Sequence, residues 1–192
     1  MNFNGTGGIL MSKVIAFYCS PRKGGYTAKL IEQVIEGAKS AGAEIVTYDL
    51  NAEGVKGCQG CFACRNFEGC ATRDLLQPMY EDLKDATGIV AGFPIYFGAV
   101  SGQGKILLDR LYPMVGDKFQ PRFPSKKVVT VFAQANPDDS LFTGAMESTH
   151  SFFKLCGWEL LENLLIYGDV APGFTLSQEL LDQAYEAGKK LV

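Results

Sequence analysis

Four cysteines crowd into one short segment, and their spacing is the strongest chemical signal in the sequence. The segment GCQGCFACRNFEGCAT sets them in the pattern C-x2-C-x2-C-x5-C, at Cys58, Cys61, Cys64 and Cys70. Thiolates this close in sequence can bind one iron–sulfur cluster, whereas a zinc site with four cysteines more often uses two separated C-x2-C pairs. Glycines at 57, 60 and 69 permit the tight turns that such a loop requires. The segment predicts a four-ligand site, and zinc and free or disulfide-forming thiols stay open as alternatives.

A second segment, YCSPRKGGYT at residues 18–27, lies between an apolar run and a helix-like run. Its glycines allow backbone N–H groups to point inward, its hydroxyl groups can donate, and the following helix presents the positive end of its dipole. This combination suits one phosphate group, and a long basic turn without a ligand is the alternative. The residues assigned to this loop are Ser20, Arg22, Lys23, Gly25, Tyr26 and Thr27.

Two motifs are absent, and their absence narrows the choice of phosphate ligand. The sequence has no G-x-x-x-x-G-K-S/T, and no G-x-G-x-x-G follows the first strand. A nucleoside triphosphatase and a dinucleotide Rossmann site are therefore disfavoured.

The other chemically capable residues have structural interpretations. Cys19 and Cys156 stand apart from the cysteine segment and are expected to be small buried residues. Lys105 and Asp109 are four residues apart, as in a pair on a helix surface. His150, the single histidine, is expected to have a structural role. No pair of side chains suited to proton transfer is identified, so no catalytic side chain is assigned.

Short β-branched runs alternate with amphipathic runs, the pattern of a parallel sheet covered by helices. Five strands are predicted, at Lys13–Tyr18, Ala43–Asp49, Gly88–Phe93, Lys127–Ala133 and Trp158–Gly168. Apolar residues at helical spacing predict five helices, the first ended by Gly42 and the last begun by a capping box at Thr175 and Gln178. The fold class is therefore α/β, a doubly wound five-stranded parallel sheet of flavodoxin-like order 2-1-3-4-5.

Composition limits the range of partners. The chain has 192 residues, 47% of them hydrophobic and 20% charged, and a formal net charge of −3. Such a chain fits one globular domain, and its acidity disfavours nucleic acid and anionic membranes. The leader MNFNGTGGILMS has neither a basic start nor a long apolar core. We expect a flexible leader at 1–12, a domain at 13–192 with a cysteine-rich loop at 58–70, and a cytoplasmic location.

The sequence resembles the flavodoxin-like NADPH-dependent FMN reductase family. The first loop is similar to the family's GSPRKGGNT, although Cys19 and Tyr26 stand where the family usually has Gly and Asn. The segment GFPIYFGAVSGQGKILLDR, residues 92–110, resembles the family's flavin loop and the helix that follows it. The cysteine segment, placed after the second strand, resembles the iron–sulfur flavoprotein branch.

The resemblance implies where the cofactors would bind. Ser20, Arg22 and Thr27 would hold the FMN phosphate. The flavin ring would be edged by the loop Pro94, Ile95, Tyr96, Phe97 and Gly98, with Ala133 and Gln134 as a third wall. Such an apolar, glycine-containing loop can lie against a flat ring and present backbone N–H groups to it. The cysteines would hold a [4Fe-4S] cluster.

Three functional hypotheses are considered, the first two from the resemblance and the third from a different class of protein. The first is an FMN-dependent electron-transfer oxidoreductase that exchanges electrons between a cluster, the flavin and a small-molecule or protein donor and acceptor. The second is a cluster-free NAD(P)H-dependent reductase of FMN, quinones or azo compounds. The third is a non-catalytic flavin- or zinc-binding interaction protein. The resemblance also implies a homodimer or homotetramer whose partner subunit helps to close the flavin site.

Overall fold

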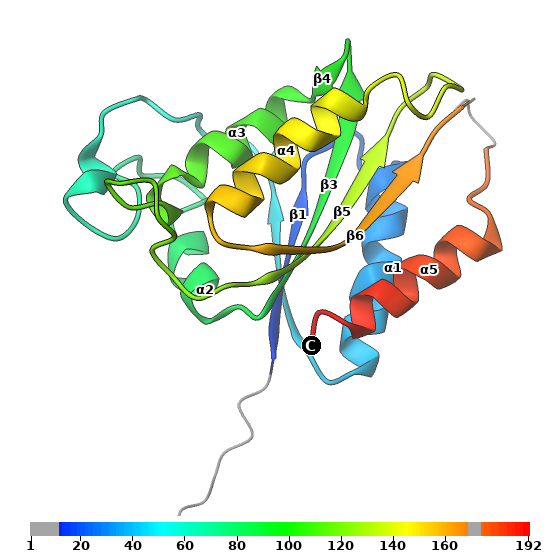
Figure 1. Ribbon diagram of the computed structural model, residues 1–192, viewed down its shortest axis with the longest axis horizontal. Coiled ribbons are helices and arrows are strands. Elements are labelled where there is room, and N and C mark those ends of the chain that lie inside the picture. Colours follow the sequence, from blue (N-terminus) through cyan, green and yellow to red (C-terminus); the bar gives the residue numbers. More distant parts are fainter. Residues whose placement is uncertain (1–11, 169–173) are drawn as a thin grey trace, which may run out of the picture.

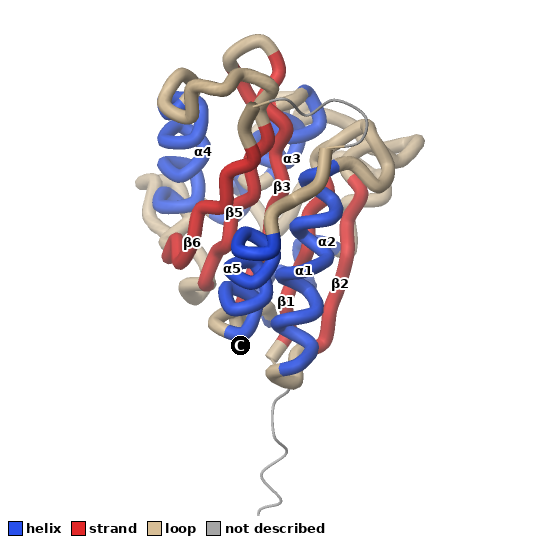
Figure 2. Tube along the Cα trace, turned by 90° about the vertical axis from the view of Figure 1, so that its right-hand side faces the viewer, coloured by secondary structure: helices blue, strands red, loops and turns tan. Residues whose placement is uncertain are grey.

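The computed structural model describes residues 12–168 and 174–192, and the predicted leader lies outside them apart from Ser12. A central sheet carries helices α1 (Tyr26–Ser40) and α5 (Gln178–Lys189) on one face. The other face carries α2 (Met79–Asp85), α3 (Gly102–Arg110) and α4 (Thr143–Leu155). Figures 1 and 2 show these three layers. Within the described ranges, no helix has the length and apolarity needed to cross a lipid bilayer.

Five strands of the sheet are parallel: β1 (Lys13–Tyr18), β2 (Glu44–Asp49), β3 (Gly88–Tyr96), β5 (Lys127–Ala133) and β6 (Glu159–Ile166). The order is β2-β1-β3-β5-β6, and a sixth strand, β4 (Ala99–Val100), pairs antiparallel with the end of β3. The five-strand prediction missed β4, and it ended β3 three residues early. Because β4 has only two residues and forms through its pairing with β3, no hydrophobic periodicity in the sequence indicates it.

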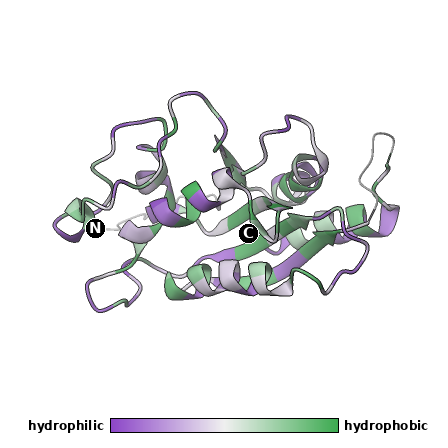
Figure 3. Ribbon diagram, turned by 90° about the horizontal axis from the view of Figure 1, so that it is seen from above, coloured by the Kyte–Doolittle hydropathy of each residue, from purple (hydrophilic) through white to green (hydrophobic). Residues whose placement is uncertain are grey.

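Each face of the sheet has its own apolar core, since the strands alternate their side chains between the faces. Ile15 and Phe17 pack under α2, α3 and α4, while Val14 and Ala16 pack under α1 and α5. Figure 3 shows the strands as a largely hydrophobic layer between helices of mixed character. The near-continuous apolar strands of the sequence follow from this burial on both faces.

Two helix ends test the capping predictions. Gly42 has a φ of +94° and follows the end of α1, as expected. The predicted capping box of α5 is wrong: the N-cap is Ser177, whose hydroxyl oxygen accepts a hydrogen bond from the Leu180 N–H. Short 3-10 turns also form at Ala63–Arg65 (η1) and Tyr112–Met114 (η2).

Glycine lets α1 and α5 pack backbone to backbone. A Cβ on Gly188 would lie 1.9 Å from the Val34 carbonyl oxygen, and one on Gly37 would lie 1.9 Å from that of Tyr185. Neither obstacle is a movable side chain, so the helices themselves would have to separate.

We predict that Gly188→Ala lowers the free energy of unfolding by about 1–3 kcal/mol or more, because overpacking forces the two helices apart. Gly144→Ala in α4 is the control, since a Cβ there meets nothing within 4 Å. It should leave stability unchanged or raise it slightly, because alanine has the better helix propensity. Chemical denaturation measures both variants, and equal stability of the two would refute the close-packing explanation.

Candidate functional site

A cleft of about 200 Å³ opens at the carboxyl ends of β1, β3 and β5. Predicted cofactor residues that line it are Ser20, Arg22, Gly25, Tyr26, Thr27, Pro94, Ile95, Tyr96, Ala133 and Gln134. The cleft adds Ala135, which the sequence analysis missed although it directly follows Gln134. Parallel strands bring these three segments together, because their carboxyl ends meet at one edge of the sheet.

Three predicted cofactor residues do not line this cleft. Lys23 lines a neighbouring groove with Glu32 and Asp49. Phe97 and Gly98 form the tip of the β3–β4 turn, where both have left-handed backbones with φ of +53° and +82°. The turn directs Phe97 into solvent, and its side chain is fully exposed.

The first loop presents an uncapped helix end to the cleft. Gly25 is the N-cap of α1, no side chain caps that end, and no acidic residue lies in its first turn. The Ser20 hydroxyl oxygen accepts a hydrogen bond from the Arg22 N–H at 3.1 Å, which folds the loop back on itself. The positive end of the α1 dipole, the Arg22 guanidinium and the buried Thr27 hydroxyl make this end of the cleft suitable for an anion.

Gln134 gives the cleft a polar atom without a partner. Its side chain is buried, and its Nε2 donates to the carbonyl oxygens of Asn136 and Asp138 at 3.3 and 2.7 Å. Its Oε1 accepts no hydrogen bond within the described part of the chain. A buried acceptor left unpaired costs about 1–3 kcal/mol, so a ligand that brings an N–H donor here would be stabilised.

The four cysteines line a second cleft, of about 230 Å³. Cys58 and Cys61 are exposed, Cys70 is half-buried and Cys64 is buried. Backbone N–H groups of Gly60 and Thr72 donate to the sulfurs of Cys58 and Cys70, each at 3.4 Å. In the described ranges no three potential ligands stand close enough together to bind a metal ion. The donor set suits a thiolate-bound metal, but the sulfurs must approach one another.

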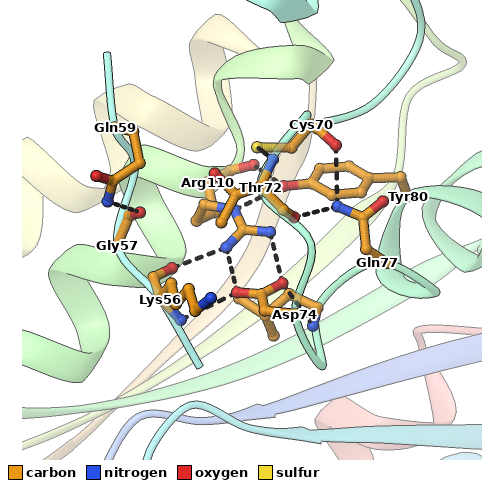
Figure 4. Close-up of polar contacts among 10 residues, drawn as sticks. Lys56, Gly57, Gln59, Cys70, Thr72, Asp74, Gln77, Tyr80 and Arg110 are labelled. Atoms are coloured by element: carbon orange, nitrogen blue, oxygen red, sulfur yellow. Dashed lines mark hydrogen bonds and ion pairs between the residues drawn. The ribbon is translucent and has the colours of Figure 1, made fainter. Parts of the chain in front are cut away.

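An ion pair without solvent exposure lies beneath this loop (Figure 4). Arg110 binds Asp74 through both terminal nitrogens, at 2.5 and 2.9 Å, and one of these nitrogens also donates to the Lys56 carbonyl at 2.7 Å. Arg110 Nε donates to the Tyr80 hydroxyl at 2.9 Å, and that hydroxyl donates to the Arg110 carbonyl at 3.0 Å. The pair thus joins the chain before Cys58 to the chain after Cys70.

The same cluster changes the pKa of two groups. Burial alone would raise the pKa of the Cys70 thiol, but hydrogen bonds from Thr72 and the charge of Arg110 outweigh it, so the pKa is lowered. Burial would likewise raise the pKa of Asp74, and the hydrogen bonds from Arg110 and Lys56 bring it below its usual value. Both shifts favour the charged forms of these groups.

The sequence analysis gave no role to Arg110, Asp74 or Tyr80. One signal was present: Arg110 lies three residues after Leu107 and one before Leu111, on the apolar stripe of a short amphipathic helix. An arginine on the apolar side of a helix is expected to be buried, and a buried arginine needs an acidic or hydrogen-bonding partner. The identity of the partner was not readable, because Asp74 lies 36 positions away.

The connection from Leu111 to Lys127 covers the cysteine loop. Arg122 donates to the carbonyl oxygens of Cys64 and Phe67 at 3.0 and 3.2 Å. Arg65 lies 4.0 Å above the ring of Tyr112 and donates to its carbonyl oxygen. Together with Arg110, these two arginines hold a loop that has few large apolar side chains to anchor it.

Helix α3 joins the two clefts. At its start the Ser101 hydroxyl donates to the Cys19 carbonyl at 2.6 Å and accepts from the Gly104 N–H, close to the first cleft. At its other end lies Arg110, in the wall of the second. Nine residues of α-helix span about 13 Å. Among the residues that the structure describes, none lines both clefts.

The structural interpretations of the other residues hold. Cys19 and Cys156 are buried, and burial raises the pKa of the Cys156 thiol to about 12. Lys105 and Asp109 form an exposed pair on α3. His150 contacts the buried Thr130 hydroxyl at 3.1 Å, away from both clefts.

Comparisons with known proteins identify relatives of the chain. Residues 12–157 match the family described as NADPH-dependent FMN reductase. An iron–sulfur flavoprotein of Methanocaldococcus jannaschii is 32% identical over 83% of this chain and 78% of its own length. A second one from the same organism is 29% identical over 73% of this chain and 70% of its own length. The NAD(P)H:quinone oxidoreductase of Methanothermobacter marburgensis superposes with a TM-score of 0.70 and 20% identity, over 95% of this chain and 99% of its own.

Proposed function

Because the chain belongs to the NADPH-dependent FMN reductase family, in its iron–sulfur flavoprotein branch, we propose an FMN-dependent electron-transfer oxidoreductase with a [4Fe-4S] cluster. The family makes it a flavin-dependent oxidoreductase, which sets aside the non-catalytic alternative. In this proposal FMN binds the cleft at the strand ends, and the four cysteines hold the cluster. FMN would supply two-electron and one-electron chemistry and the cluster one-electron chemistry, toward a small-molecule or protein donor and acceptor, with NAD(P)H as the candidate reductant.

The unpaired Gln134 oxygen is the observation that carries the assignment of FMN. The pyrimidine edge of a flavin ring has an N–H group, and Gln134 Oε1 is a buried acceptor with no partner among the described residues. At the other end of the same cleft, Ser20, Arg22 and the start of α1 provide hydroxyl, guanidinium and N–H donors for a phosphate. One molecule with both groups at its two ends matches the cleft.

The residues of the cleft bind and orient, and none transfers a proton. Pro94 and Ile95 present an apolar wall, and Ile95 is buried. The Ser101 hydroxyl, just after the β3–β4 hairpin, donates to the Cys19 carbonyl and so holds the end of this hairpin in place. Bound FMN supplies the redox chemistry, since it accepts a hydride or single electrons.

Three observations support a cluster at the cysteines. All four line one cleft, two of their sulfurs already accept backbone N–H hydrogen bonds, and Arg110 lies in the cleft wall. Thiolates that accept such bonds beside a cation suit an iron–sulfur cluster, whose potential depends on these contacts. The cluster would supply one-electron transfer.

A cluster-free NAD(P)H-dependent reductase is the second candidate. It is favoured by the separation of the four sulfurs, which form no ready metal-binding group within the described ranges. The name of the Methanothermobacter relative agrees with it as well. In this case FMN alone would carry electrons from nicotinamide to a quinone-like acceptor.

A homodimer or homotetramer completes the proposal. Phe97 is fully exposed at the tip of the β3–β4 turn, and Tyr96 beside it is partly exposed at the flavin cleft. An aromatic side chain held in solvent by a left-handed backbone is suited to pack against a second subunit. That subunit would cover the open side of the cleft.

We predict that Ser20→Ala with Thr27→Ala raises the Kd for FMN about 10- to 100-fold, because hydrogen bonds to a charged phosphate are lost. The Kd for riboflavin, which has no phosphate, should be unchanged. Gln134→Met should weaken both flavins, since it acts on the ring. Fluorescence titration measures each Kd, with Ser151→Ala on α4 as the control. An unchanged Kd for FMN in the double variant would contradict the assignment.

We predict that anaerobic reconstitution with iron and sulfide gives the native chain about four iron atoms per subunit, because one [4Fe-4S] cluster forms. Cys61→Ala removes one ligand and should take up far less, whereas Cys156→Ala, outside the loop, should match the native chain. Iron assay and visible absorption measure the outcome. A native chain without stoichiometric iron would leave the cluster-free reductase as the function.

We predict that Phe97→Ser shifts the oligomer toward monomer and weakens FMN binding. Phe119→Ser is a matched control, because Phe119 is also exposed and also has a left-handed backbone, with φ of +57°. Light scattering measures the mass of each variant. If the native chain is a monomer in light scattering and still binds FMN tightly, the flavin site is not shared between two subunits.

A further inference from the structure

The buried pair of Arg110 and Asp74 joins segments that no regular element holds together. Between Leu50 and Met79 the chain forms only the short 3-10 turn η1, so backbone ladders fix little of it. Arg110 reaches this stretch from the end of α3, a rigid helix. Its contacts with Lys56 and Asp74 fall just outside the first and last cysteines.

The contacts form a closed ring. The Asp74 carboxylate accepts from the Lys56 N–H at 3.0 Å and from the Leu76 N–H at 3.1 Å, while Arg110 donates to both Asp74 and the Lys56 carbonyl. Lys56 is thus held through its N–H and its carbonyl. This fixes the distance between the two ends of the cysteine loop.

Tyr80 connects the ring to the last cysteine. Its hydroxyl exchanges hydrogen bonds with Arg110 and also contacts the Cys70 thiol. Gln77 donates to the Cys70 carbonyl at 2.9 Å and so holds the backbone there (Figure 4). By contrast, Cys58 and Cys61 lie in the exposed half of the loop, where Gly60 and Phe62 have left-handed backbones.

We propose that Arg110 is the positioning residue of the cluster site: it ties the two ends of the cysteine loop together through Asp74, Lys56 and Tyr80. The four sulfurs thereby face one cleft before iron arrives. This inference rests on the proposed function. In it, Cys64 and Cys70 form the fixed side of the site, and Cys58 and Cys61 form the side that closes on the metal.

The positive charge of Arg110, in the wall of the cysteine cleft, would also affect the reduction potential of a bound cluster. The reduced cluster carries one more negative charge than the oxidised one, and a nearby positive charge favours it. Arg110 is fully buried and lines the cleft, so solvent screens its charge little. Loss of that charge alone should lower the midpoint potential of the cluster.

The test compares variants that separate positioning from stability. Arg110→Gln leaves Asp74 buried without its cation and can unfold the chain. Arg110→Met with Asp74→Leu replaces both charges by apolar groups, which commonly preserves folding. Lys126→Met is the control, because Lys126 is another buried cation and lies outside the cysteine cleft. Bound FMN verifies folding, since no described residue lines both clefts.

Two measurements are made on the double variant. In metal-free protein, hydrogen exchange of the amides at 57–73 should be about tenfold faster or more, because the loop ends are no longer tied. After anaerobic reconstitution, iron affinity against a chelator should fall about 10- to 100-fold. Lys126→Met should match the native chain in both. The midpoint potential of reconstituted Arg110→Gln should be lower than that of the native chain.

The outcomes separate the two proposals. If the double variant keeps native exchange and native iron affinity, Arg110 has no positioning role, while the cluster assignment stands. If Lys126→Met loses iron equally, the effect is one of general stability and the positioning role is again refuted. If the native chain binds no iron, the cluster assignment fails, and this role fails with it.

Discussion

Helix α3 is held at both ends by buried hydrogen bonds, and the placement of both clefts depends on it. Ser101 fixes its start to the Cys19 carbonyl, which sets the end of the β3–β4 hairpin against the first loop. Arg110 fixes its end to Asp74 and Tyr80, which sets the cysteine loop against the helix. The helix, about 13 Å long, therefore runs from beside the first cleft to the wall of the second. Because α3 packs on β3 through Gly104 and Phe93, the sheet fixes the position of the helix.

The two clefts differ in how far folding alone completes them. The cleft at the strand ends is formed by three strand ends and a helix start, and one of its buried acceptors, Gln134 Oε1, has no partner among the described residues. The cysteine loop is instead fixed at its ends and open at its middle, where the exposed Cys58 and Cys61 lie. Metal sites of this kind couple ligand binding to folding: the thiolates already share one cleft, and they close to bonding distance only when an ion is present. The proposed cluster would bring the exposed Cys58 and Cys61 together with Cys64 and Cys70 and so order the middle of the loop.

The sequence predicts the parts of the fold that repeat along the chain, and it misses the parts that depend on single long-range contacts. The parallel strands and the helices follow from the alternation of apolar runs, and the cleft at the strand ends follows because the carboxyl ends of parallel strands meet at one edge of the sheet. The two-residue β4 exists only through its pairing with β3. The N-cap of the last helix is Ser177 and not Thr175, so that helix begins two residues later than predicted. The cysteine spacing indicates the candidate ligands, but it does not give the distances between their sulfur atoms. The partner of Arg110 could not be found, because nothing local in the sequence links positions 74 and 110.

In the proposed function, one chain carries both a flavin and a one-electron centre in separate clefts. An anaerobic reductive titration of the reconstituted, FMN-bound chain counts the electrons directly. We expect an uptake of about three electron equivalents per subunit, two by the flavin and one by the cluster, with bleaching in both absorption regions. Uptake of about two equivalents by a chain that contains stoichiometric FMN would contradict it, because the flavin alone would then explain all of the reduction.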